Sequence, residues 1–112
     1  MKRGIRFLAM LAAVVLTAKL GRIEYNGHYE TWYDLNMTNV IIRAHNNGMY
    51  GDYWIDEQGL KRFDDYVIVA ANWNVHPYGS LVETSRGIGI VLDTGDFTKD
   101  EPYTIDLATA WK

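Results

Sequence analysis

Alternation of side chains with a period of two is the dominant pattern in this chain, and it predicts β-strands. Between His28 and Asp34, the β-forming residues Tyr29, Thr31 and Tyr33 alternate with a second set of side chains, which is typical of a half-buried strand. Similar short runs, separated by turn-prone residues, recur along the chain. The expected strands cover residues 28–34, 39–44, 53–55, 66–71, 80–84, 88–93 and 103–108, and residues 60–65 are expected to form one helical turn.

The run from Tyr66 to Ala71 differs from the others because it is almost entirely apolar. Such a run predicts a strand that is buried on both faces. About six or seven short strands with little helix favour a small closed β-barrel. We therefore expect an all-β fold with a six-stranded barrel formed by a single domain at residues 29–112, preceded by a connector at residues 19–28.

The N-terminal segment carries a different pattern. Lys2, Arg3 and Arg6 precede an almost unbroken apolar run from Phe7 to Ala18. A basic head followed by such a run is typical of an export signal, and the run is short for a membrane-spanning helix. We expect residues 1–18 to be a signal peptide or an uncleaved membrane anchor, with an apolar helix packed on the domain as the alternative. The protein is then expected in the cell envelope or outside the cell.

Composition narrows the possible chemistry. The 112 residues include no cysteine, which excludes disulfides, a thiolate nucleophile and a cysteine zinc site. The full chain has a net charge of −3, and because residues 1–18 hold three basic residues and no acid, the remainder carries −6. An acidic body without a basic stripe argues against a nucleic-acid partner. His28, His45 and His76 are too scattered to suggest a metal site, and we expect no cofactor.

Two acids near the C-terminus stand out because each lies in an apolar strand. Asp93 ends the run that begins at Gly87, and Asp106 lies between Ile105 and Leu107. A carboxylate among apolar side chains is costly to bury unless it is hydrogen-bonded, paired or functional. If the two strands close one sheet, their carboxylates converge, so they are the first candidates for catalysis.

Asp93 also belongs to an Asp-Thr-Gly sequence, which is the active-site motif of aspartic proteases. That fold places the motif early in the chain and needs a flap and further strands to build the cleft. Here only 17 residues follow Gly95, and no second Asp-Thr-Gly is present. A three-residue motif outside its structural context is weak, and we reject the protease interpretation.

Four segments of the chain match the order and spacing of motifs in another family, and this match is more extensive than the match to aspartic proteases. They are Ala70 to Asn72, Pro77 to Ser80, Gly87 to Gly95 and Thr104 to Leu107. This arrangement resembles the three-aspartate (3D) domain of bacterial cell-wall proteins, a double-psi β-barrel also similar to lytic transglycosylase barrels. Residues 30–33 resemble the opening strand of that family. The resemblance covers about residues 66–108 and implies a double-psi β-barrel.

The chain departs from the family at two positions and in the loop that leads to the last strand. Asn72 stands where the family has its first aspartate, and Asp96 stands where it has a second glycine after Asp-Thr-Gly. By resemblance, Asp106 corresponds to the catalytic acid and Asp93 to its neighbour. A lytic transglycosylase cleaves the bond between N-acetylmuramic acid and N-acetylglucosamine without water, using one acid that first donates and then accepts a proton. The resemblance therefore implies cleavage of peptidoglycan glycan strands to 1,6-anhydro products.

The loop that follows Ala71 supplies the expected substrate-binding residues, which are Asn72, Trp73, His76 and Tyr78. Aromatic rings in such a loop stack on sugar faces. Arg86, at a hairpin tip, is expected to be a solvated charge. Two alternatives stay open: a non-catalytic glycan-binding module in which Asn72 marks a decayed site, and a structural protein whose barrel serves assembly only. An enzyme should have an acid at the base of an open groove, whereas a binding module should have a flat aromatic platform.

Overall fold

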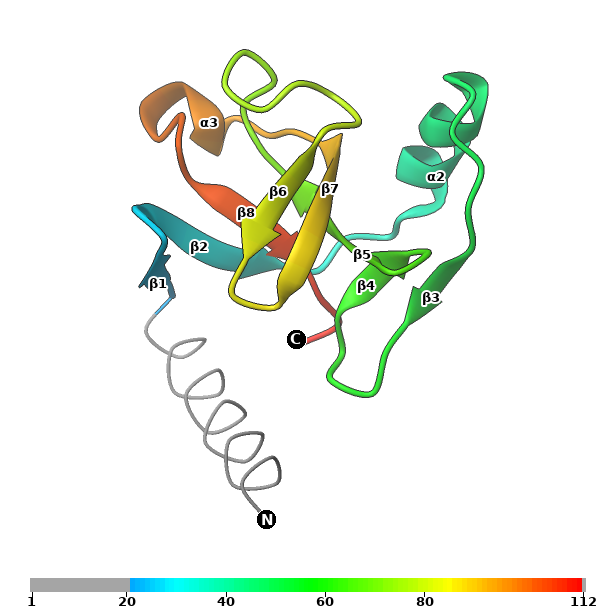
Figure 1. The fold of residues 1–112 in the computed structure, drawn as a ribbon, viewed down its shortest axis with the longest axis horizontal. Helices are drawn as coiled ribbons and strands as arrows, with labels where there is room; N and C mark the ends of the chain where they lie inside the picture. Colours follow the sequence, from blue (N-terminus) through cyan, green and yellow to red (C-terminus); the bar gives the residue numbers. More distant parts are fainter. Residues whose placement is uncertain (1–20, 112) are drawn as a thin grey trace.

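The computed structural model describes residues 21–111, which form a mostly β domain with a mixed eight-stranded sheet and two short helices (Figure 1). The expected signal or anchor at residues 1–18 lies outside this range. No helix within residues 21–111 is long and apolar enough to cross a membrane. The elements are β1 (Ile23–Tyr25), β2 (His28–Tyr33), α2 (Thr38–Asn46), β3 (Tyr53–Ile55), β4 (Lys61–Phe63), β5 (Tyr66–Ala70), β6 (Leu81–Thr84), β7 (Gly87–Asp93), α3 (Phe97–Asp100) and β8 (Ile105–Ala108).

Strand β5 is the centre of the sheet. One of its edges pairs in parallel with β7, and it also pairs antiparallel with β4 and β8. β8 pairs in parallel with β2, and β7 pairs antiparallel with β6. All five residues from Val67 to Ala71 are buried, which confirms the prediction of a strand covered on both faces.

An apolar core lies on each face of the sheet. On the helix-covered face, Val40 and Ala44 of α2 pack with Ile68 of β5 and with Leu92 of β7. On the opposite face, a second cluster encloses residues from four segments, with Trp32, Val82 and Trp111 packed at its border. Its buried members are Leu60, Val67, Val69, Ala71, Val91, Ile105 and Leu107.

The expected closed six-stranded barrel is corrected to an eight-stranded sheet with free edges. Within residues 21–111, no strand pairing closes the sheet into a ring, because β1, β3 and β6 each pair with one strand. A side chain links β2 to the β6–β7 hairpin instead. The Glu30 carboxylate accepts hydrogen bonds from the backbone N–H of Ser85 at 3.0 Å and from its hydroxyl at 2.5 Å.

The expected strand at residues 39–44 is wrong, because these residues belong to helix α2. β-branched side chains favoured a strand at this position, but the buried residues Met37, Val40 and Ala44 follow helical spacing. Asn36 lies just before the N-cap residue Met37, and its Oδ1 accepts the Thr38 backbone N–H at 3.0 Å, which satisfies one of the free N–H groups of the first turn. Packing of one helical face therefore outweighs local β-propensity.

The expected helical turn at residues 60–65 is also wrong, because Lys61–Phe63 form strand β4. Lys61 and Phe63 are both buried there. The Lys61 ammonium donates to the Asp34 carboxylate and to the Leu35 carbonyl oxygen, so its burial is compensated. Strand β1 occupies part of the segment that we expected to be a connector.

Candidate functional site

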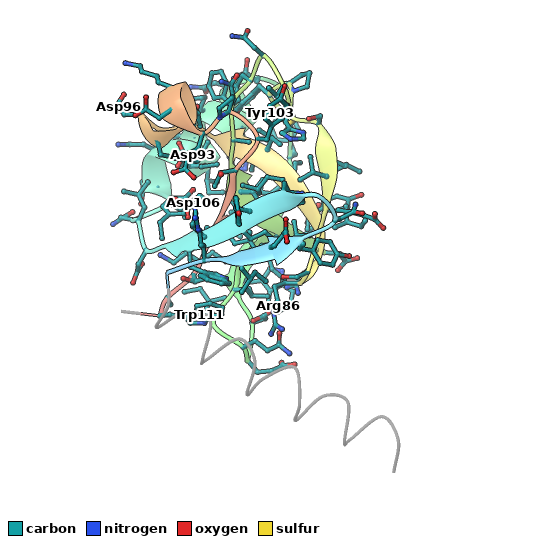
Figure 2. The ribbon with its side chains drawn as sticks, turned by 90° about the vertical axis from the view of Figure 1, so that its left-hand side faces the viewer. Arg86, Asp93, Asp96, Tyr103, Asp106 and Trp111 are labelled. Carbon is teal, nitrogen blue, oxygen red and sulfur yellow. The ribbon has the colours of Figure 1, made fainter. Side chains whose placement is uncertain are left out.

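The two aspartates singled out by the sequence lie in one row across four strands. Ala70 of β5 is opposite Asp93 of β7 on one side and opposite Asp106 of β8 on the other. Asp106 is in turn opposite Thr31 of β2. Because paired residues in neighbouring strands project to the same face, the two carboxylates flank the small Ala70 side chain, with their Cα atoms roughly 10 Å apart. Figure 2 shows Asp93 and Asp106 on the same side of the molecule.

Asp93 is held firmly in place. Its Oδ2 accepts a hydrogen bond from the Tyr33 hydroxyl at 2.9 Å, and its Oδ1 accepts the Thr94 backbone N–H at 2.9 Å. The residue is only 9% exposed. A register shift in the β5–β7 pairing next to Ala70 brings Asp93 into this position.

Tyr33 acts as a hydrogen-bond donor at this site. Burial, the charge of Asp93 and the hydrogen bond to Asp93 raise the pKa of the Tyr33 hydroxyl far above its usual value of 10.0, with a further contribution from Asp106. The phenol therefore stays protonated at physiological pH. It can orient the Asp93 carboxylate but does not serve as a base.

Asp106 is more accessible than Asp93. Its residue is half-buried, and its Oδ1 accepts the Thr31 hydroxyl at 2.8 Å. A carboxyl group that is oriented by a neighbouring hydroxyl and partly open to solvent is suited to exchange protons with a ligand.

Two of the predicted loop aromatics lie beside Asp93. The Trp73 indole N–H donates to the Asp93 backbone oxygen at 3.0 Å. The Trp73 and Tyr78 rings meet edge to face, with centroids 5.0 Å apart. Trp73 remains 37% exposed, so its ring is available for stacking next to the acids.

The Asn72 side chain is engaged within the protein. Its Nδ2 donates to the Thr98 carbonyl oxygen at 3.3 Å, and its Oδ1 accepts the Asn74 backbone N–H at 2.8 Å. Its backbone oxygen accepts the N–H groups of Val75 and His76. Asn72 therefore ties its loop to the segment around α3.

His76 lies away from the two acids. It lines a cavity of about 420 Å³ together with His28, Val82 and Ile105. His28 and Thr31 are separated by three positions on β2, so their side chains project to opposite faces of the sheet. Burial, followed by the charge of His28, lowers the pKa of His76. The structure thus brings together Asp93, Asp106, Trp73 and Tyr78, but not His76.

Sequence reasoning missed two hydroxyl donors and a buried polar network. The two donors are Thr31 and Tyr33, which the alternating pattern places in a strand. Nothing in the local sequence indicates that their hydroxyls bond Asp106 and Asp93. Glu30 is fully buried and bonds Ser85 and His28. Arg86, expected to be solvated, is only 7% exposed and donates to the Gln58 side-chain oxygen at 2.5 Å, which corrects that expectation. Figure 2 places Arg86 far from Asp93 and Asp106.

Among residues 21–111, no group of three or more histidine or acidic side chains is arranged to hold a metal ion. Comparison of the chain with known protein families, with curated proteins and with solved structures finds no match.

Proposed function

We propose that this protein cleaves peptidoglycan glycan strands in the manner of a lytic transglycosylase, with Asp106 as the acid and base. The observation that supports this most is the row of Asp93, Ala70, Asp106 and Thr31 across four strands. It sets an oriented, partly accessible acid near a second, buried carboxylate. The exposed Trp73 ring beside Asp93 offers a stacking surface for a sugar.

Each step of the proposed reaction uses groups of this site. Asp106 donates its proton to the glycosidic oxygen as the bond to C1 of N-acetylmuramic acid breaks. The resulting Asp106 carboxylate then takes the proton of the 6-hydroxyl of that sugar, and O6 bonds to C1 to form the 1,6-anhydro ring. Asp93, fixed by Tyr33, supplies negative charge that stabilises the oxocarbenium-like transition state.

The finer architecture forms part of the same proposal. Two parallel pairs, β2–β8 and β5–β7, flank the antiparallel β5–β8 pair. The Glu30–Ser85 contact joins the two outer edges of this arrangement, and the second core is enclosed between them. These features support an arrangement of the double-psi type whose outer edges are joined by a side-chain contact and not by strand pairing. Action on peptidoglycan also requires export, which we attribute to residues 1–18.

The test is mass spectrometry of purified peptidoglycan incubated with the full chain. Anhydro-muramyl products are expected from the wild type and not from Asp106→Asn. Asp96→Asn is the matched control, because the Asp96 side chain is fully exposed, and it should cleave normally. Loss of activity in both variants, or in neither, would remove Asp106 from the proposed role.

A non-catalytic glycan-binding module is the second candidate function. It is favoured by Asn72, whose amide is occupied by bonds within the protein where the resembling family carries an acid. A folded wild-type chain that releases no products and yet sediments with peptidoglycan would establish this function in place of cleavage.

A further inference from the structure

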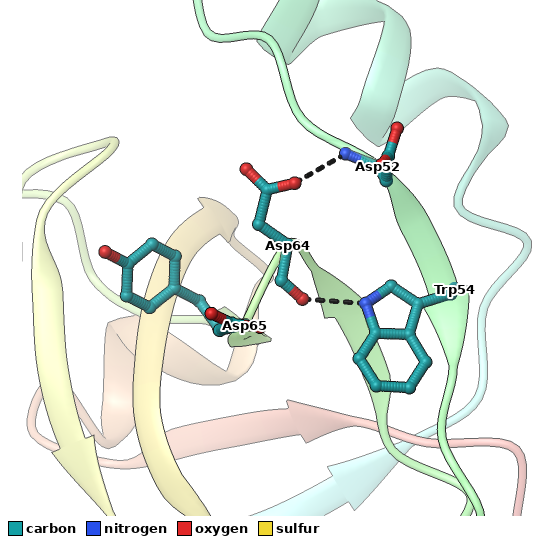
Figure 3. Close-up of a pocket in the computed structure, with 5 residues that line it drawn as sticks. Asp52, Trp54, Asp64 and Asp65 are labelled. Atoms are coloured by element: carbon teal, nitrogen blue, oxygen red, sulfur yellow. Dashed lines mark hydrogen bonds between the residues drawn. The ribbon is translucent and has the colours of Figure 1, made fainter.

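A pocket lined by aromatic and acidic side chains lies at the end of β5 that is opposite to the two candidate catalytic acids. It has a volume of about 740 Å³ and is lined by Asp52, Trp54, Asp64, Asp65 and Tyr66 (Figure 3). Tyr66 and Ala70 are four positions apart on β5, which corresponds to roughly 13 Å. Helix α2 packs on Ile68 between them, so this pocket is separate from the candidate catalytic site.

Trp54 presents a fixed aromatic platform in this pocket. Its residue is 42% exposed, although its indole N–H is already bonded to the Asp64 backbone oxygen at 2.7 Å. Figure 3 shows this bond together with the bond from the Asp52 N–H to the Asp64 carboxylate. Because its polar atom is satisfied, Trp54 offers a ligand only its apolar ring, held in one orientation.

The chemistry of the lining favours a ligand with an apolar face and several hydroxyl donors. The three carboxylates are exposed and provide acceptor oxygens around the two aromatic rings, so hydroxyl groups of a ligand find charge-assisted hydrogen bonds. A pyranose ring matches both features, since its C–H face stacks on an aromatic ring while its hydroxyls project outward.

A cation fits this pocket less well. No set of three acids in the described part of the chain is arranged for a metal ion. The Arg62 guanidinium already lies 5.9 Å from the centre of the Trp54 ring, so positive charge is supplied there by the protein itself.

We propose that the pocket of Asp52, Trp54, Asp64, Asp65 and Tyr66 is a second saccharide-binding site, with the Trp54 ring as its stacking platform. This second site rests on the proposed function only for the identity of its ligand, which is an N-acetylated, β-1,4-linked glycan. Two sites on one small domain allow a glycan strand to be held at a distance from the point of cleavage.

The test is titration of the ¹⁵N-labelled full chain with the soluble trimer of β-1,4-linked N-acetylglucosamine, followed by nuclear magnetic resonance. Any detergent used to keep the full chain in solution should lack a sugar headgroup, so that it does not compete with the trimer for the site. Saturable shifts are expected at the Trp54 indole N–H and at the backbone amides of residues 64–66. Trp54→Ala is expected to weaken this binding by at least roughly tenfold, and Trp54→Phe, which keeps a ring, by less.

Tyr29→Ala is the matched control, because Tyr29 is also a strand aromatic, is 41% exposed and carries an arginine over its ring. It should bind like the wild type. Asp65→Ala removes an exposed acceptor without touching the Trp54 bond and is expected to weaken binding severalfold, so the proposal stays testable if Trp54→Ala does not fold.

Three outcomes would overturn the proposal. They are unchanged affinity in both Trp54→Ala and Asp65→Ala, shifts confined to the surroundings of Trp73, and a response of the Trp54 peak to 1,5-diaminopentane but not to the trimer. Trimer binding that persists in Asp106→Asn separates this site from the proposed catalysis. The second site then stands even if no cleavage is observed, and it falls if cleavage occurs without binding at Trp54.

Discussion

The Tyr33 hydroxyl links β2 to β7, because it donates a hydrogen bond to the Asp93 carboxylate. Replacing Tyr33 by phenylalanine removes the bond to the buried Asp93 carboxylate and leaves the ring in place. We expect Tyr33→Phe to lower the free energy of unfolding by about 1–3 kcal/mol and to reduce any glycan cleavage. Urea denaturation measures the first effect. Tyr50→Phe, at a residue that is 78% exposed, should change neither, and equal stability of the two variants would contradict the proposed role of the hydroxyl.

Glu30 is the fully buried acid on the opposite face of β2. Its carboxylate accepts two hydrogen bonds from Ser85. Removal of either side chain therefore leaves a polar group of the other without its partner. Glu30→Gln is expected to cost about 1.5–3 kcal/mol of stability. In a double-mutant cycle with Ser85→Ala, the two changes should be coupled by more than about 0.5 kcal/mol. Additive effects would show that Glu30 does not hold the hairpin through Ser85.

At the scale of elements, the β6–β7 hairpin depends on two glycines. Gly87 has a φ of +106°, which other residues rarely adopt. At Gly89, an added Cβ would lie 2.9 Å from Val69 Cγ1 and 3.1 Å from Thr84 Cγ2. The Gly-x-Gly sequence is thus explained by one backbone requirement and one close approach of β7 to its neighbours.

Gly89→Ala is therefore expected to destabilise the protein by about 1–3 kcal/mol, because β7 must move away from β5 to make room. Thermal unfolding followed by circular dichroism measures the change. Ile88→Ala in the same strand is the comparison, since Ile88 is 42% exposed and should cost less. A larger loss of stability in Ile88→Ala than in Gly89→Ala would mean that the neighbours of Gly89 make room for a methyl group at little cost.

The elements also show which local patterns are informative. A continuous apolar run predicted β5, and the apolar runs that carry Asp93 and Asp106 predicted β7 and β8. The pattern failed where a long-range contact decides the structure. Residues 39–44 have the composition of a strand and form a helix because one face packs on Ile68, and Lys61 is buried because Asp34 is close by.

At the scale of the whole molecule, His76 and Asp56 make stability depend on pH on the acid side of neutrality. Burial and His28 lower the pKa of His76 below 6.5. Burial alone would raise the pKa of Asp56, but hydrogen bonds from Arg62, Leu60 and Gln58 lower it below 3.8. In both cases the unfolded chain binds more protons just below the ordinary pKa, so stability decreases as the pH falls.

We expect two losses of stability on acidification, the first below about pH 6.5 and the second below about pH 3.8. His76→Asn should abolish the first, which is expected to be less than about 1 kcal/mol because the imidazole is only half-buried. Asp56→Asn should reduce the second. Urea denaturation at a series of pH values measures both. A first loss that is unchanged in His76→Asn would assign it to another group.

The sequence could name the two acids but not their surroundings. Asp93 and Asp106 are visible because acids are rare in apolar strands. Thr31, Tyr33 and Ala70 complete the site only through the pairing of β2, β5, β7 and β8, and strand pairing between distant segments leaves no local pattern. Burial of Glu30 and Arg86 was missed for the same reason. The Trp54 platform was missed because exposure of an aromatic ring depends on its neighbours in space.

The pairing of β2 with β8 has a consequence for the order of assembly. The bond from Thr31 to Asp106 spans 75 positions, and that from Tyr33 to Asp93 spans 60. A nascent chain in which residues 105–108 have not yet been made lacks one of the two partners of β2 and one neighbour of β5. The candidate site therefore cannot assemble stepwise as the N-terminal strands are made, because it forms only after β8 has paired with β2 and β5.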